Sequence, residues 1–168
     1  MLTASLARVI ARDLRALRRE VEAYADERDL WRVVPGITNP GGALALYLAG
    51  NLQHFVGAVV GGTGYVRDRA AEFHRRDVPR SQLLRQVDET LVAVERTLAA
   101  LGEDALARPF PQPHGGAPVT TGAFLLHLAT HLTYHLGQID YHRRMLTGQA
   151  GQIRAVAVDE LDRSPPVP

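Results

Sequence analysis

Apolar residues recur at intervals of three and four along residues 2–28, and arginines occupy the positions between them. This spacing places apolar side chains on one face of a helix and charged ones on the other. The same period runs through residues 81–101. Both stretches are predicted to form amphipathic helices. Their apolar positions are Leu2, Leu6, Val9, Ile10, Leu14, Leu17, Val21 and Tyr24, then Leu84, Val87, Leu91, Val94, Leu98 and Leu101.

Residues 41–60 are apolar nearly all round, which predicts the most deeply buried helix of the fold. The segment is long enough to cross a membrane. However, Asn51, Gln53 and His54 lie in its second half, and no positively charged flank precedes it. We therefore interpret it as a core helix and expect no membrane insertion.

A fourth helix is predicted from Thr120 or Thr121 to Gly148, where glycine and the preceding arginines favour a C-terminus. For the second helix, Asn39 is the expected N-cap and Pro40 the first helical residue. Ser81 is the expected N-cap of the third helix.

The segment 61–80 is too long for a tight turn between antiparallel neighbours. Extended, about twenty residues reach roughly 60 Å, twice the ~30 Å length of a twenty-residue helix. The segment can therefore return along the second helix, leaving the second and third helices parallel. The predicted fold is all-α, an up-down-down-up four-helix bundle with one long crossover. Residues 1–148 form this single domain, and residues 149–168 form a C-terminal tail.

Composition excludes several functions. The chain has no cysteine, so it has neither disulfides nor thiolate metal ligands of its own. A net charge of +1 is too small for a nucleic-acid-binding surface. All nineteen basic residues are arginine, which excludes a Schiff-base lysine. The N-terminus lacks the unbroken apolar core of a signal peptide, and we expect a cytoplasmic protein.

Three histidines, His127, His131 and His135, lie four residues apart in the fourth predicted helix. This spacing keeps them on one helix face, and neutral imidazole is the commonest metal ligand in proteins. A rise of about 1.5 Å per residue separates the first from the last by roughly 12 Å, too far for one ion with ~2.1 Å bonds. An adjacent pair can bind, so this helix supplies at most two ligands. Spacing alone leaves open whether His127 or His135 pairs with His131.

The third ligand must come from elsewhere, and His54 in the most buried helix is the obvious donor. Small neighbours on its own face leave room around the imidazole. An HExxH zinc-protease site fits poorly, because Leu132 occupies the position of the general base. A di-iron site also fits poorly, because the second predicted helix carries no carboxylate and the fourth carries only Asp140. A three-histidine site with open coordination positions remains, of the kind that catalytic zinc uses.

The chain resembles the DinB-like superfamily of damage-inducible and YfiT-like metal-binding bundles over residues 1–148. The resemblance rests on Asn51-Leu52-Gln53-His54 and on His131-Leu132-Thr133-Tyr134-His135-Leu136-Gly137-Gln138-Ile139. It implies an up-down-down-up bundle, a ligand triad of His54, His131 and His135, a zinc or nickel ion, and a homodimer. Some branches are similar to S-transferases or isomerases that use bacillithiol, mycothiol or glutathione.

Two functions are therefore expected: a metal-dependent transferase that uses a low-molecular-weight thiol, or a non-catalytic stress-response protein with a structural ion. Asn51 and Gln138 are candidates to orient a substrate at the ion. Arg67 and Arg69 are candidates to meet an anionic group of the thiol, although either could be a solvated loop charge.

Leu30 and Trp31, with no predicted cover, favour a two-fold dimer; alternatively, Trp31 closes one end of the bundle. A protonated His142 near the last turn would suit the helix dipole.

Overall fold

The computed structural model describes residues 2–112, 118–151 and 153–161. Over these ranges the chain is helical and has no β-strand, only an isolated bridge between Pro109 and Thr120. The all-α prediction is therefore confirmed. The elements are α1 (Leu2–Ala23), η1 (Glu27–Trp31), α2 (Gly41–Leu52), η2 (Gln53–Val60), α3 (Arg69–His74), α4 (Arg80–Ala100), η3 (Glu103–Ala107), α5 (Thr121–Thr147) and η4 (Val158–Glu160).

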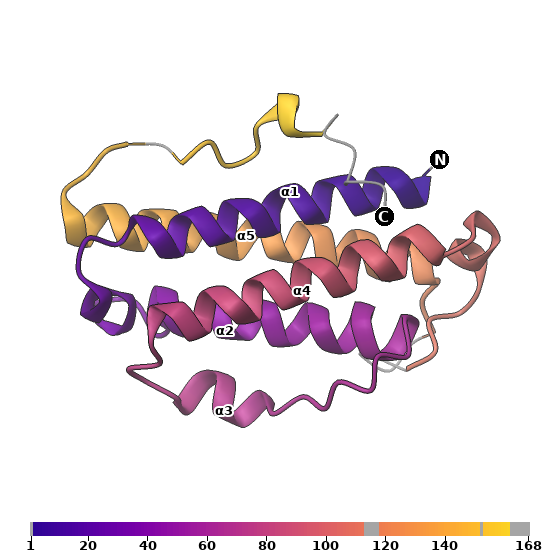
Figure 1. Ribbon diagram of the computed structural model, residues 1–168, viewed down its shortest axis with the longest axis horizontal. Coiled ribbons are helices and arrows are strands. Elements are labelled where there is room, and N and C mark those ends of the chain that lie inside the picture. Colours follow the sequence, from indigo (N-terminus) through magenta and orange to yellow (C-terminus); the bar gives the residue numbers. More distant parts are fainter. Residues whose placement is uncertain (1, 113–117, 152, 162–168) are drawn as a thin grey trace.

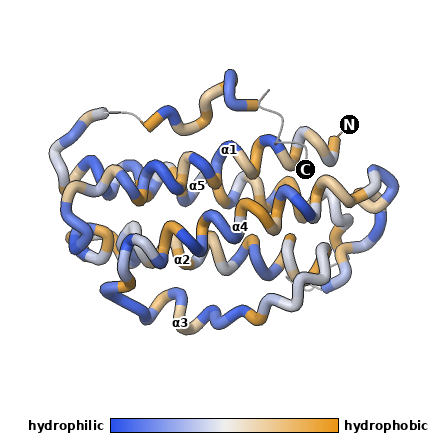
Figure 2. The backbone as a smooth tube through the Cα atoms, in the orientation of Figure 1, coloured by the Kyte–Doolittle hydropathy of each residue, from blue (hydrophilic) through white to orange (hydrophobic). Residues whose placement is uncertain are grey.

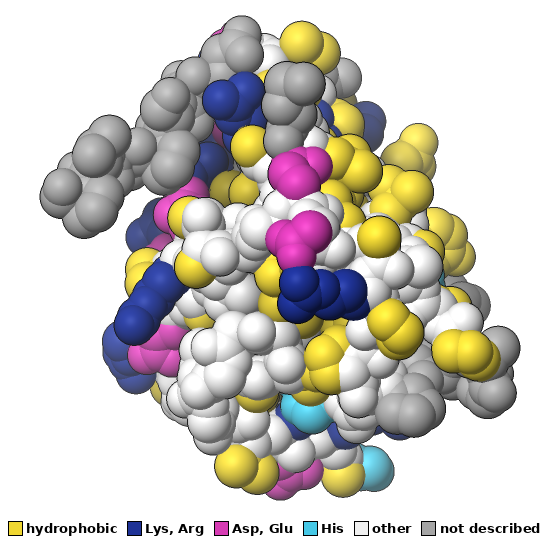
Figure 3. Space-filling model, turned by 90° about the vertical axis from the view of Figure 1, so that its right-hand side faces the viewer, with side chains coloured by type: hydrophobic (Ala, Val, Ile, Leu, Met, Phe, Trp, Pro, Cys, Tyr) yellow, Lys and Arg dark blue, Asp and Glu magenta, His cyan; other side chains and the backbone are white. Residues whose placement is uncertain are grey.

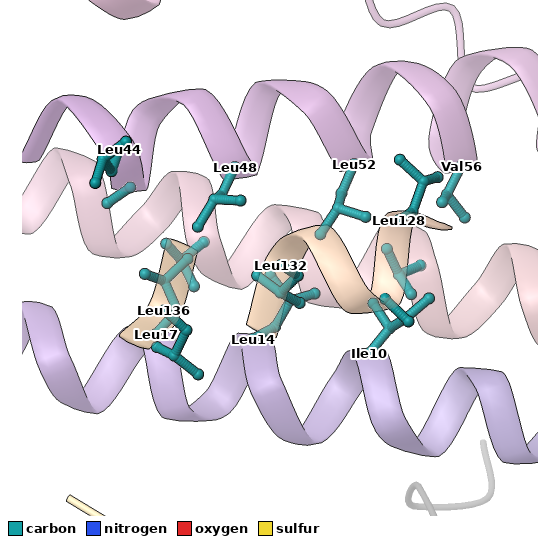
Figure 4. Packing of buried hydrophobic residues seen from close by; sticks show 14 of the residues in the cluster. Ile10, Leu14, Leu17, Leu44, Leu48, Leu52, Val56, Leu128, Leu132 and Leu136 are labelled. Carbon is teal, nitrogen blue, oxygen red and sulfur yellow. The ribbon is translucent and has the colours of Figure 1, made fainter. Parts of the chain in front are cut away.

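The four long helices pack around one hydrophobic core. Helix α1 contacts α4 and α5, and α2 contacts the same two helices from the other side (Figure 1). Hydrophobic and hydrophilic residues alternate along α1 and α4, as the tube in Figure 2 shows, whereas α2 is mostly apolar. In Figure 4, Leu48 and Leu52 of α2 face Leu14 of α1, and Leu132 of α5 lies between them. Each fully buried leucine stabilises the fold by roughly 1.5–3 kcal/mol.

The predicted second helix changes character at its middle. Residues 41–52 are α-helical, whereas η2 is a π-helix that continues directly from α2. Segment 41–60 is, within the described ranges, the one helical stretch apolar and long enough to cross a membrane, and about two thirds of its apolar stretch is buried inside the protein. Such burial is typical of a core helix. The π segment matters for the site because it carries His54.

The predicted caps of α2 and α4 are wrong. The residue before α2 is Pro40, and no side chain caps that end. Helix α4 begins at Arg80, one residue before Ser81, and the Arg80 amide donates instead to Glu27 Oε1 at 2.7 Å. A tertiary contact thus replaces the local cap.

The caps of α5 agree with the prediction. Thr120 accepts a hydrogen bond from the Ala123 amide, and Gly148 ends the helix at φ 65°. This left-handed conformation has little cost for glycine, which has no Cβ.

The first helix ends earlier than predicted, at Ala23. After it, η1 folds back and buries Leu30 and Trp31, which are 0% and 7% exposed. A Cβ on Gly42 would overlap the Trp31 ring, so glycine permits this close packing. Trp31 therefore packs into the core at the end of α2, and the use of Leu30 and Trp31 as evidence for a dimer was wrong.

The crossover contains a short helix, α3, that the sequence pattern did not predict. Asp68 caps it by accepting from the Ala71 amide. Glu72 is buried at 7% exposure and lies against Gly50 of α2, where any Cβ would overlap its carboxylate. The crossover is thereby held against α2.

The tail beyond α5 follows α1 back along the molecule (Figure 1). Arg19 donates to the Ile153 carbonyl at 2.9 Å and pairs with Glu160 at 3.2 Å. Arg143 donates to the Gly151 carbonyl at 3.2 Å. The described part of the tail is thus attached to α1 and α5 by arginines.

Candidate metal centre

His131 and His135 of α5 bring their Nε2 atoms to 3.1 Å from each other. Both rings are half-buried and lie edge to face, with centroids 4.6 Å apart. Two ligands of one ion, with bonds of about 2.1 Å and an angle of about 90–110°, lie about 3.0–3.4 Å apart. The two nitrogens therefore have the separation of two ligands on one ion.

Gln138 orients the second of these rings. Its side-chain oxygen lies 2.6 Å from Nδ1 of His135. Because an amide oxygen can only accept, the ring proton is assigned to Nδ1, and the lone pair of Nε2 faces His131. Gln138, which the sequence placed near the ion, thus contacts the predicted ligand His135, three residues before it.

His131 is neutral near physiological pH. Burial, followed by the proximity of His135, His127 and Arg67, lowers its pKa from 6.5 to about 4. Only a neutral imidazole has a lone pair to offer an ion. The hydroxyl of Tyr47 on α2 also lies 3.2 Å from Nε2 of His131.

His54 lies on another wall of the cavity that His131 lines. This cavity has a volume of about 460 Å³ and is bounded by α2, η2, the crossover and α5. Nε2 of His54 donates to Gln112 Oε1 at 3.0 Å, and its Nδ1 is buried without a hydrogen-bond partner. Among the described residues, no group of three or more His, Cys, Asp or Glu side chains is placed to hold an ion. The structure thus brings two of the three predicted ligands together and leaves the third apart.

His127 is exposed and lines the same cavity. Its ring stacks on that of His131, with centroids 5.7 Å apart and planes 25° apart. His127 and His131 thus contact each other through stacked rings, whereas His131 and His135 contact each other through their Nε2 atoms.

Asn51 and the two crossover arginines also line the cavity. Asn51 is buried, and its Oδ1 has no partner. Arg67 makes two hydrogen bonds to Glu72, of 2.8 and 2.7 Å, so its charge is largely balanced. Arg69 is exposed, lies 5.2 Å from the centre of the Phe73 ring, and has no ion pair within the described ranges. Of the two, Arg69 is better placed to meet an anion.

Two residues that contact the histidines were missed from the sequence. Tyr47 has a recoverable signal, since Tyr47, Asn51 and His54 follow the i, i+4, i+7 spacing of one helix face. No sequence pattern indicates that Gln112 would contact His54, because Gln112 lies in a Pro-rich loop whose path depends on tertiary packing.

A second cavity, of about 520 Å³, lies beside the histidine pair. It is lined by residues 36–39 and by α5 side chains that include His135, Gln138 and Tyr141. His131 therefore borders one cavity and His135 borders the other.

The sequence profile of the DinB superfamily matches residues 11–139. The chain belongs to the DinB superfamily. The match extends from α1 to Ile139 of α5 and so includes His54, His131 and His135. No curated protein matches the chain.

The metal ion expected of a DinB-like protein fits the side chains present. Neutral His131 and His135 have the separation of two ligands, and Gln138 presents the second lone pair. The buried Nδ1 of His54 and Oδ1 of Asn51 lack partners, and both residues line the cavity that His131 borders. Buried polar atoms are normally paired, so these two unpaired atoms, on residues of the cavity that His131 borders, are compatible with a bound group there.

Proposed function

We propose that this DinB-superfamily protein binds one divalent ion through His131, His135 and His54. The observation that carries the proposal is the 3.1 Å separation of the two Nε2 atoms on α5. The unpartnered Nδ1 of His54 supports the third ligand. Zinc and nickel both accept imidazole nitrogen, and we expect one of these two.

We further propose that the site accepts a low-molecular-weight thiol and that the protein is a cytoplasmic, thiol-dependent S-transferase or isomerase. A divalent ion would lower the pKa of a bound thiol and favour the nucleophilic thiolate. The support is the cavity of about 460 Å³ beside His54 and His131. Asn51 would orient the ligand in this cavity, and exposed Arg69 would meet an anionic group on it.

A second candidate is a non-catalytic, stress-response protein in which the ion is structural. The observation in its favour is that His54 and His131 lie on separate elements, η2 and α5. An ion shared between them would hold these elements together. The two candidates differ in whether a small molecule reaches the ion.

We also infer that the long helices form the up-down-down-up bundle. The contacts of α1 and of α2 with both α4 and α5 support it. In Figure 1, α2 and α4 run in the same direction, and residues 61–79 return alongside them.

Metal analysis of the purified protein tests the site. We expect about one ion per chain in the wild type, and at least a tenfold loss of affinity in His54→Ala, His131→Ala and His135→Ala, because each removes a ligand. His74→Ala is the matched control, since His74 is exposed and, among the described residues, its side chain bonds to the Ala70 carbonyl alone. Undiminished metal content in any one of the three variants removes that residue from the triad.

Titration of the cobalt-loaded protein with bacillithiol, mycothiol and glutathione then separates the two candidates. A transferase site gives a sulfur-to-cobalt charge-transfer band with at least one thiol. Full cobalt occupancy without a band for any thiol supports the structural ion.

A further inference from the structure

The Tyr47 hydroxyl lies at the atoms that would hold the ion. It is 3.2 Å from Nε2 of His131. The ring stands edge-on to both histidines, with centroids 5.4 Å from His131 and 5.6 Å from His135. Tyr47 thus contacts both members of the pair, although it lies on α2 and they lie on α5.

The crossover fixes the Tyr47 ring from its other side. Phe73 of α3 packs against it at 4.9 Å between centroids, and the Arg67 guanidinium lies 5.4 Å from its centre. Arg67 is held in turn by buried Glu72, which occupies the space that Gly50 leaves. The Tyr47 ring is therefore held by packing on this side in addition to the contact of its hydroxyl with His131.

An ion on Nε2 of His131 would take the lone pair that faces this hydroxyl, because a neutral imidazole nitrogen has only one. A half-buried hydroxyl without a partner is unfavourable. Neighbouring ligands on one ion lie about 3.0–3.4 Å apart. A hydroxyl 3.2 Å from the nitrogen of one ligand therefore lies beside the coordination sphere of the proposed ion, where it can donate to an atom in a neighbouring position.

We propose that Tyr47 is a positioning residue that donates a hydrogen bond to the sulfur or anion completing the coordination of the ion. This inference rests on the proposed metal site. It adds a donor that the resemblance did not supply, and it gives the α3 crossover a function in ligand binding.

The test compares Tyr47→Phe with Tyr134→Phe on cobalt-loaded protein, with 2-mercaptoethanol and azide as probes. Tyr134 is the matched control, because its ring lies 5.2 Å from that of His135 while its side chain is 66% exposed. In Tyr47→Phe we expect the circular dichroism spectrum and the cobalt affinity to be unchanged. The affinity for each probe should fall about twofold to tenfold, because the variant lacks one hydrogen bond to the bound probe. Tyr134→Phe should match the wild type in all measurements.

The possible outcomes are distinguishable. Equal probe affinities in the wild type and Tyr47→Phe overturn the inference, as does a wild type that binds cobalt but neither probe. A hundredfold loss of cobalt affinity in Tyr47→Phe makes the tyrosine a direct ligand and also overturns it. A wild type that takes up no cobalt overturns the metal site, and this inference falls with it.

Discussion

His142 is the most deeply buried histidine described on α5, at 1% exposure. Its Nε2 donates to the Arg32 carbonyl at 2.8 Å, and its Nδ1 accepts from the Tyr24 hydroxyl at 2.7 Å. Burial lowers its pKa below the ordinary 6.5. A protonated ring at this end of the helix would suit the helix dipole, but burial favours the neutral ring, and helical position alone does not reveal that burial.

Acid should destabilise the fold partly through this residue. A folded pKa below the unfolded value means that the unfolded chain binds more protons, so the contribution is present above pH 6.5 and is lost as the pH falls below it. Urea unfolding with a chelator present, at pH 7.5, 6.5 and 5.5, should show the wild type losing more stability than His142→Gln. At pH 7.5 the substitution itself should cost about 1–3 kcal/mol, since the buried ring is replaced and its hydrogen bonds to the Tyr24 hydroxyl and the Arg32 carbonyl are disturbed. His131 titrates in both proteins, so parallel pH profiles would contradict the assignment to His142.

Sequence spacing predicted the parts of the site that belong to one helix. His131, His135 and Gln138 follow each other at intervals of four and three, and the structure places them in contact. Spacing could not predict Gln112 as the partner of His54, because that contact joins residues 58 positions apart. The triad itself stays a prediction.

Among the elements, the long helices were predictable and the short ones were not. The predicted limits of α4 and α5 agree with the structure to within about a residue, and for α5 the reason is that Thr120 and Gly148 mark its ends. An apolar period alone does not fix an end, because α1 stops at Ala23 and not at the predicted residue 28. Helix α3 has only six residues, too few for a period to emerge, and it depends on the contact of Glu72 with Gly50. The π-helical turn of η2 has no pattern of its own in an almost wholly apolar segment.

Gly50→Ala should release the crossover. The new Cβ would displace the Glu72 carboxylate and break its pairing with Arg67, at a local cost of about 1.5–3 kcal/mol for hydrogen bonds between charged groups. Alanine also gains about 1 kcal/mol of helix propensity, so the net loss of global stability should be only about 0.5–2 kcal/mol. Trypsin should cleave after the arginines of residues 67–76 roughly tenfold faster, because local opening limits that cleavage.

Gly137→Ala is the control for this experiment. A Cβ at Gly137 meets no neighbouring atom within 4 Å, so this variant should gain stability without faster cleavage. Unchanged cleavage in Gly50→Ala would contradict the proposed attachment of α3.

At the scale of the molecule, exposed apolar side chains follow one face of α5. Leu126, Tyr134, Tyr141 and Met145 are 57%, 66%, 66% and 62% exposed, and Gly137 lies between the tyrosines. In Figure 3, apolar side chains gather along the right-hand edge of the end view, and histidine appears below them. We propose that this α5 face pairs two chains about a two-fold axis, since such a patch typically marks an interface.

Light scattering at high micromolar concentration tests the pairing. The wild type should be a dimer, and Leu126→Glu combined with Met145→Glu should be a monomer, because charge replaces apolar contact on the α5 face. Val92→Glu is the control, since Val92 is a 64% exposed apolar residue on α4. A monomeric wild type would end the dimer hypothesis.

The histidine pair stands between two cavities, so its two members face different spaces. A transferase that joins a thiol to a second molecule must bring both to one atom. With one space beside His131 and another beside His135, the reactants need not share an entrance. For the proposed transferase, neither reactant would then compete with the other in steady-state kinetics, and each could be excluded separately by filling one cavity.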